Sequence, residues 1–155
     1  MSADEHDLDP ASDALDVFLD FREADMLLWR RAGSSLGLSA MAMLALAQVL
    51  RAHARDAPVR QVDLSEALQL SPAGTSAIVT ALEERDLVRR VPSATDGRAV
   101  NIVPGDGSKE IGAGLLAADE VFLRLVAEVS PEGLRGFLHI MGGMRDLSGR
   151  KFSDA

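Results

Sequence analysis

The stretch that decides the fold is PVRQVDLSEALQLSPAGTSAIVTALEERDLVRRVPSATDGRAVNIVP, residues 58–104. Apolar side chains at helical spacing predict a first helix over 62–68 and a second over 72–85, separated by a turn at 69–71. Ser71 is a favourable N-cap for the second helix, and Pro72 suits its first position, where no N–H is needed. The facing apolar positions are Leu64, Ala67 and Leu68 on one helix and Ile78, Val79 and Leu82 on the other. Two short helices joined by a tight turn predict a helix-turn-helix.

A predicted β-hairpin follows the second helix directly. Residues 87–91 and 99–103 are rich in strand-forming side chains, and the turn-forming residues 92–98 between them include an Asp96-Gly97 step. A hairpin in this position is a wing. The expected fold class is therefore mainly α with a small β wing, a winged helix-turn-helix whose second helix enters the DNA major groove.

The segments before residue 58 are predicted to be a tail and two helices. Residues 1–12 are acidic without apolar periodicity, which is typical of a disordered tail. A helix from about Ser12 to Arg31 is apolar on two faces, so we expect one face to pack on its own domain and the other on a second subunit. Gly33-Ser34-Ser35 is expected to end this helix, and Ser39 to cap the next one.

Two further helices are predicted after the wing. Asp106 or Ser108 can cap one that runs to about Val129, and Ser130-Pro131 starts the last. With the first helix, they carry more apolar surface than one small winged domain can cover, so an obligate homodimer is expected. The predicted organisation is a tail at 1–12, N-terminal helices at 13–57, the winged domain at 58–104, C-terminal dimerisation helices at 105–148 and a tail at 149–155.

The composition narrows the possible functions. The formal net charge is −8, of which residues 58–104 contribute −1, from five arginines and six acidic residues. DNA-binding proteins usually carry a basic surface, so the DNA affinity is expected to be modest and sensitive to salt.

The absence of cysteine excludes disulfides and thiolate zinc sites, and no apolar run reaches the ~18 residues that span a bilayer. We therefore expect a cytoplasmic protein that does not enter a membrane.

Three runs of residues carry a resemblance to a known family. They are Arg60–Leu68, Leu82–Arg90 and Asp96–Val100, and the Asp-x-Arg wing pattern after a Leu-Val-x-Arg strand is the most specific part. The chain resembles the MarR family of bacterial transcriptional regulators over about residues 12–147. The resemblance implies a homodimer built from the terminal helices, with recognition helices in successive major grooves of double-stranded DNA and wings at the flanking minor grooves. It also implies repression and, in many members, release of DNA by a small, often phenolic, effector.

The candidate DNA-binding residues follow from this match. Arg98 at the wing tip is expected in the minor groove, whose negative potential favours an inserted arginine. Arg89 and Arg90 alternate across a strand, so only one can face DNA, and the family match favours Arg90. Asp96 and Gly97 are expected to structure the wing. The predicted DNA-binding set is Ser71, Ala73, Gly74, Thr75, Ser76, Thr80, Arg90 and Arg98. Ala77 and Ala81 stand where family members often have arginines.

The remaining predictions concern an effector, catalysis and the alternatives. An apolar cleft between the dimer helices and the winged domain, lined by Trp29, Met41 and Leu44, is the expected site for a small aromatic effector. No catalytic constellation, phosphate loop or metal-ligand spacing is present, so no catalytic residue, cofactor or metal is assigned. Two alternatives stay open: a winged protein-interaction module that has lost DNA readout, and a small enzyme, which would need a convergent polar pocket. An interaction module need not keep Arg90 and Arg98 on one face with the recognition helix.

Overall fold

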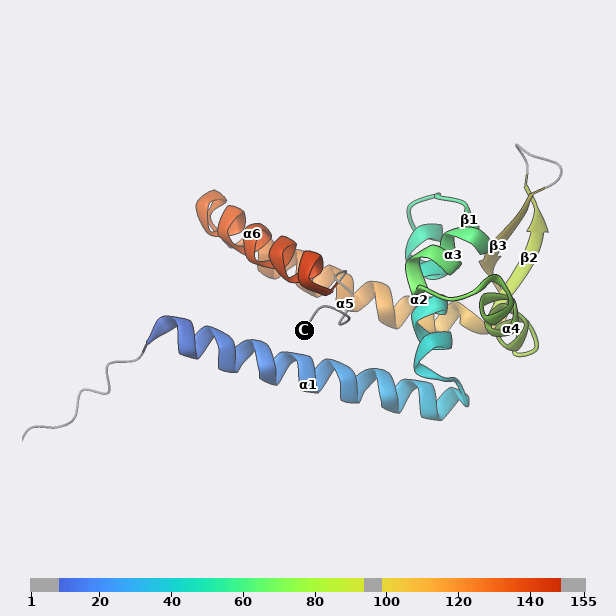
Figure 1. Ribbon diagram of the computed structural model, residues 1–155, viewed down its shortest axis with the longest axis horizontal. Coiled ribbons are helices and arrows are strands. Elements are labelled where there is room, and N and C mark those ends of the chain that lie inside the picture. Colours follow the sequence, from blue (N-terminus) through green and yellow to red (C-terminus); the bar gives the residue numbers. More distant parts are fainter. Residues whose placement is uncertain (1–8, 94–98, 149–155) are drawn as a thin grey trace, which may run out of the picture. The chain divides into compact units, whose positions relative to one another are not determined.

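The computed structural model describes residues 9–93 and 99–148 of the chain (Figure 1). The chain divides into two compact units, Met1–Lys109 and Glu110–Ala155. Each of the six predicted helices is present, with ends that differ by a few residues from those expected. The elements in chain order are α1 (Pro10–Leu36), α2 (Ala40–His53), β1 (Val59–Arg60), α3 (Gln61–Leu68), α4 (Pro72–Glu83), β2 (Val88–Pro92), β3 (Val100–Pro104), the 3-10 turn η1 (Asp106–Ser108), α5 (Lys109–Ala127) and α6 (Pro131–Ser148).

The sheet is antiparallel and has the order β1-β3-β2. β2 and β3 are the predicted wing strands, and Arg90 lies opposite Ile102. The sequence did not predict β1, because a strand of two residues has too few positions to show an alternating pattern. Val59 of β1 also lies opposite Ile102, and both side chains are buried. Val59 thus extends the hydrophobic core of the first unit to the sheet.

The core of the first unit is built around α2. This helix is apolar over most of its surface, and half of its 14 residues are buried. It contacts α1, α3, α4, β1 and β3, which explains why a helix without a polar side is stable here. The fully buried side chains around it include Leu64 of α3, Val79 and Leu82 of α4, and Val88 of β2. α2 therefore joins the helix-turn-helix to the sheet, alongside direct contacts of α4 with β2 and of α3 with β1 and β3.

The predicted end of the first helix is wrong. α1 continues through Gly33-Ser34-Ser35 to Leu36, and Gly37, with φ 63°, is its left-handed cap. Gly33 is buried inside the helix, where an added Cβ would lie 3.0 Å from the Leu38 carbonyl oxygen and 3.3 Å from the Met43 side chain. The glycine therefore allows α1 and α2 to approach closely. At the other end, α1 begins at Pro10, two residues before the predicted start.

Local caps place the helices that follow. Ser39 caps α2 by accepting the Ala42 N–H at 3.2 Å, as predicted. Ser130 caps α6 by accepting the Gly133 N–H at 3.1 Å, again as predicted. In the second unit, α5 and α6 are in contact through Phe122 and Phe137, whose ring centroids are 6.2 Å apart.

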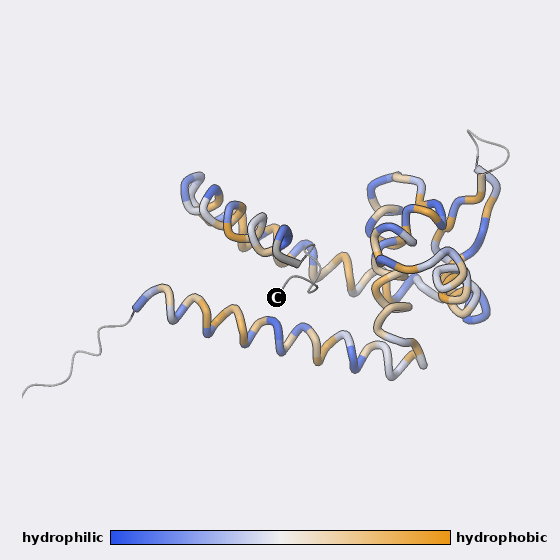
Figure 2. The backbone as a smooth tube through the Cα atoms, viewed as in Figure 1, coloured by the Kyte–Doolittle hydropathy of each residue, from blue (hydrophilic) through white to orange (hydrophobic). Residues whose placement is uncertain are grey.

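α1, α5 and α6 are rich in apolar residues (Figure 2), and many of their large apolar side chains are exposed. In the described part of the chain, no single helix is both long and apolar enough to cross a membrane, and α1 with α2 passes that test only as a pair bent by 95°. The exposed large apolar residues of these three helices and of the loop after α5 are Leu15, Val17, Leu19, Phe21, Met26, Leu28, Leu116, Val121, Phe122, Leu123, Leu125, Val129, Phe137, Leu138, Ile140 and Met141.

Candidate nucleic-acid interface

The N-terminus of α4 is built as predicted. Ser71 has extended backbone angles, and its side chain accepts the Gly74 N–H at 3.1 Å, while Pro72 occupies the first helical position. The Ser71 side chain is exposed, so its hydroxyl can still donate to an acceptor outside the protein. A capped, exposed helix start of this kind offers backbone N–H groups and a hydroxyl to a phosphate.

The exposed side of α4 is uncharged and made of small residues. Ala73, Ala77 and Thr80 are exposed, and Gly74 and Ser76 are half-buried. An added Cβ at Gly74 would lie 3.3 Å from Ser71 Oγ, and no atom of α3 lies within 4 Å of it. Packing against α3 therefore does not require the glycine. This side of the helix offers hydroxyl and methyl groups to a groove.

Thr75 is a correction to the predicted DNA-binding set. Its side chain is fully buried, with 0% of its surface exposed, and so does not face a groove. Its hydroxyl donates to Ser71 O at 3.1 Å and accepts from Ser65 Oγ at 3.0 Å, which links α4 to α3. A signal was present in the sequence, because Thr75 precedes the core residues Val79 and Leu82 by four and seven positions and so shares their face.

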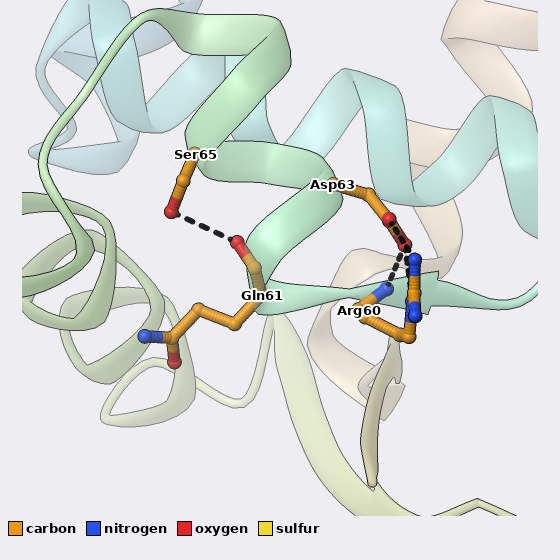
Figure 3. A network of polar contacts seen from close by, with 4 residues as sticks. All are labelled: Arg60, Gln61, Asp63 and Ser65. Carbon is orange, nitrogen blue, oxygen red and sulfur yellow. Dashed lines mark hydrogen bonds and ion pairs between the residues drawn. The ribbon is translucent and has the colours of Figure 1, made fainter.

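The start of α3 carries a network of polar contacts (Figure 3). Asp63 Oδ2 accepts the Arg60 backbone N–H at 2.8 Å and Arg60 Nε at 3.2 Å, and Asp63 Oδ1 accepts Arg60 Nη2 at 2.7 Å. The hydrogen bonds from Arg60 hold the pKa of the Asp63 carboxyl below its ordinary value. Ser65 Oγ also lies 3.0 Å from Gln61 O, and Gln61 Nε2 donates to Pro72 O at 3.3 Å. The Gln61 side chain thus joins the start of α3 to the start of α4, while the other contacts hold the first turn of α3.

Arg85 lies just beyond the C-terminus of α4 and connects it to the corner between α1 and α2. Its Nη1 donates to Ala81 O at 2.9 Å, and its Nη2 donates to Gly37 O at 3.3 Å. Both acceptors are carbonyls at helix ends, which a guanidinium satisfies well. Arg85 therefore acts as a cap and a link between two helices.

Arg89 and Arg90 occupy opposite faces of β2. The Arg90 side chain is turned towards α4 and forms an ion pair with Glu83, so it is less accessible than the prediction required. Arg89 is exposed, and its charge contributes, after the hydrogen bond and the charge of Lys109, to lowering the pKa of the Asp106 carboxyl. The alternation expected from the sequence is present, but the strand turns the favoured arginine towards the protein.

The wing tip lies outside the described residues. Asp96, Gly97 and Arg98 are in this segment, so their predicted roles stay predictions.

The predicted effector-site residues lie on α1 and α2. Trp29 is half-buried and donates its Nε1 hydrogen to Asp25 at 3.1 Å, Met41 is half-buried, and Leu44 is 44% exposed. An open cavity of about 250 Å³ occurs elsewhere in the first unit, where α2 meets β3, and none of the three lines it. Its lining is Val49, His53, Asp56, Ala57, Pro58, Asn101, Ile102 and Val103. Among the described residues, no group of three or more His, Asp or Glu side chains is placed to hold a metal ion.

Known proteins resemble this chain in sequence profile and in fold. Residues 36–99 match the model of the MarR family. A MepR mutant from a multidrug-resistant S. aureus clinical isolate has a TM-score of 0.61 at 18% identity, covering 84% of this chain and 93% of that chain. The transcription regulator MarR from Oenococcus oeni has a TM-score of 0.60 at 16% identity, covering 85% and 98%. Another S. aureus MepR mutant, bound to an oligodeoxyribonucleotide, has a TM-score of 0.54 at 22% identity, covering 84% and 94%. No curated protein matches the chain. The predicted fold class is confirmed.

Proposed function

We propose that this chain, which matches the MarR family over residues 36–99 and has the fold of MarR-family regulators, is a DNA-binding transcriptional regulator. The observation that carries the proposal is α4. It is capped by Ser71, exposes an uncharged side, and leads directly into the hairpin that forms a wing. A helix of this kind in a winged helix-turn-helix is shaped to enter a major groove. The structure of a MepR mutant with an oligodeoxyribonucleotide supports this use of the fold.

The proposed contacts divide between the helix and the wing tip. In α4, Ser71 and the backbone near Gly74 are proposed to meet phosphate, while Ala73, Ser76 and Thr80 meet base edges. Arg98 is proposed to enter the minor groove, where it adds affinity with little sequence preference. Asp96 and Gly97 are proposed to shape the hairpin turn around it.

The proposed assembly is a homodimer on a pseudo-palindromic operator in the cytoplasm. The exposed apolar side chains of α1, α5 and α6 support a second subunit, because large apolar side chains exposed in this number mark an interface. A two-fold dimer presents two recognition helices, and its operator has two related half-sites about one helical turn apart. We further propose repression by occupancy of the operator, relieved by a small aromatic effector near Trp29, Met41 and Leu44.

The test is selection of bound fragments from the source genome, followed by footprinting at low salt. We expect enrichment of one or a few sites, each protected over two half-sites. Absence of any enriched site at low salt would contradict the proposed function.

A second function is favoured by one observation. Of the described arginines of the winged region, Arg60, Arg85 and Arg90 contact acceptors within the protein, whereas Arg89 is exposed; the chain has a net charge of −8. A winged protein-interaction module that has lost DNA readout has the same features. Failure of the DNA selection, together with a stable dimer, would favour this alternative.

A further inference from the structure

Arg90 joins the wing to α4 through both its backbone and its side chain. Its backbone N–H donates to Glu83 Oε1 at 2.9 Å, and its Nη1 forms an ion pair with Glu83 Oε2. Its Nη2 lies 3.4 Å from Ser76 O and 3.5 Å from Thr80 Oγ1. The contacts of this one arginine therefore extend over residues 76–83 of the recognition helix.

The backbone contact follows from the position of β2 in the sheet. β2 is an edge strand, and an edge strand leaves alternate N–H groups without a partner strand. The Arg90 N–H is one of these, and the Glu83 carboxylate accepts it. Glu83 thus links α4 to the backbone N–H of Arg90 in β2. The orientation of this N–H is fixed by the strand, whereas a side chain can rotate to another conformation.

The side-chain contact removes Arg90 from the set of available cations. About 28% of the Arg90 side chain and 29% of the Glu83 side chain are exposed, so the pair is partly withdrawn from water. The charge of Arg90 is balanced by Glu83, and its hydrogen-bond donors are directed along α4. Charge-assisted hydrogen bonds of this kind are shorter and stronger than neutral ones and hold both groups in one orientation.

We propose that Arg90 is a positioning residue that locks the wing onto the recognition helix, so that α4 and the hairpin meet DNA as one rigid body. It does not itself neutralise a phosphate. The inference rests on the proposed function, because it concerns how that DNA interface is held. Specific binding needs α4 and the wing to reach their grooves together, whereas nonspecific binding depends mainly on total charge. Loss of the link should therefore lower specificity without changing the number of phosphate contacts.

The first experiment measures DNA binding by Arg90→Ala and Glu83→Gln, on the selected operator and on a scrambled duplex, over a range of salt concentrations. Glu84→Gln is the matched control, because it removes the same charge from the neighbouring exposed residue. For Arg90→Ala and Glu83→Gln we expect the ratio of the scrambled to the operator Kd to fall about tenfold, the equivalent of ~1.4 kcal/mol. The salt slope should stay within ~0.5 of the wild-type value, and Glu84→Gln should keep the ratio.

The same titrations would reveal a direct contact between Arg90 and a phosphate. If Arg90 neutralises a phosphate, Arg90→Ala weakens binding to both duplexes alike and flattens the salt slope by ~1 unit. Glu83→Gln would then release the arginine and tighten binding to both duplexes more than Glu84→Gln does. Either result would overturn the positioning role.

A second experiment needs no DNA and separates this inference from the proposed function. Hydrogen exchange of the Arg90 backbone N–H is measured in the wild type, Glu83→Ala and Glu84→Ala at one protein concentration. Glu83→Ala should speed this exchange about tenfold, because the acceptor is lost, while Glu84→Ala should leave it unchanged. Equal exchange in all three would show that the link does not hold the strand, whatever the DNA titrations give. A wild type that binds no DNA but shows the expected exchange would contradict the proposed function and keep the link.

Discussion

Thr75 ties α4 to α3 with a single hydroxyl group. The hydroxyl is fully buried, donates its hydrogen to Ser71 O and accepts one hydrogen bond, from Ser65 Oγ. Ser76, the next residue, is half-buried and lies about 100° further round the helix. Two adjacent small polar residues therefore have separate roles, one in the core and one at the proposed DNA surface.

We predict that Thr75→Val lowers the free energy of unfolding by ~1 kcal/mol, because it removes these hydrogen bonds at little change in size. Ser76→Ala should change it by less than ~0.5 kcal/mol, as is usual for a side chain without such contacts. On the operator, Ser76→Ala should cost ~1–3 kcal/mol at a contacted base pair and leave nonspecific binding unchanged. Urea denaturation measures the free energies of unfolding, and titration of operator DNA measures the affinities. Equal stability losses for the two variants would contradict the assignment.

Asp63 is the second residue whose chemistry fixes local structure. Its carboxylate accepts the backbone N–H that precedes α3 and pairs with the Arg60 guanidinium. The pKa of Asp63 is lowered from 3.8, so its contribution to stability is fully present above that pH and is lost as the pH falls through the folded-state value. The side chain is 39% exposed, so solvent screening keeps the ionic part small.

We predict that Asp63→Ala lowers the free energy of unfolding by ~0.5–2 kcal/mol at pH 7, through loss of the cap. Asp63→Asn should lose a few tenths of a kcal/mol, because it keeps an acceptor oxygen but not the charge. The gap between wild type and Asp63→Asn should narrow as the pH falls from 6 towards 3. Denaturation curves at several pH values test this. A stability difference that widens in acid would show that the predicted direction of the pH dependence is wrong.

At the scale of elements, the exposed side of α4 determines how DNA can be read. Ala73, Ala77 and Thr80 are exposed, and they offer methyl groups and one hydroxyl to a groove. Bidentate hydrogen bonding to guanine or adenine needs Arg, Lys, Asn or Gln, none of which occurs between Ser71 and Leu82. The contact open to an alanine is with the C5 methyl group of thymine.

We predict that replacing thymine with deoxyuridine at the centre of each operator half-site weakens binding by ~1 kcal/mol per contacted methyl group, since the C5 methyl alone is removed. Replacement outside the half-sites is the matched control and should have no effect. For the Ala77→Gly variant, the thymine duplex and the deoxyuridine duplex should bind with equal affinity when the replaced base is the one that Ala77 contacts. Unchanged affinity for every deoxyuridine duplex would leave DNA shape as the remaining source of specificity.

At the scale of the whole molecule, α1, α5 and α6 carry most of the exposed large apolar residues, whereas Val62 and Val100 are the only such residues in the described part of the winged region. Such surface is unfavourable in water at ~25 cal/mol per Å², so a second subunit is the simplest cover for it. Obligate interfaces of intertwined helices bury on the order of 2,000 Å² or more.

We predict that the wild type sediments as a dimer at micromolar concentration and that Leu123→Glu, at a side chain 63% exposed in the single chain, shifts it to monomers. Each leucine that the interface buries contributes ~1.5–3 kcal/mol, and both subunits lose one. Ala73→Glu, on α4, is the control and should remain dimeric. A folded wild-type monomer at this concentration would contradict the assembly.

The amino-acid sequence by itself determined the order of the helices, the helix-turn-helix and the two wing strands. Ser39, Ser71 and Ser130 were identified as caps because each cap bonds to an N–H three residues away. Apolar periodicity likewise depends on neighbours within one or two helical turns. Interactions of such short range can be read from a linear sequence.

The tertiary structure alone decided where several side chains point. Gly33 was expected to end a helix, but the proximity of Met43 and of the Leu38 carbonyl makes it a packing residue inside α1. Arg90 was favoured for DNA over Arg89, but Glu83, which lies seven residues earlier on another element, turns it towards α4. Strand alternation fixes that the two arginines oppose each other, and only packing against α4 fixes which of them is turned inward. The physical reason is that a side chain's orientation depends on partners that the fold, rather than the chain order, brings near.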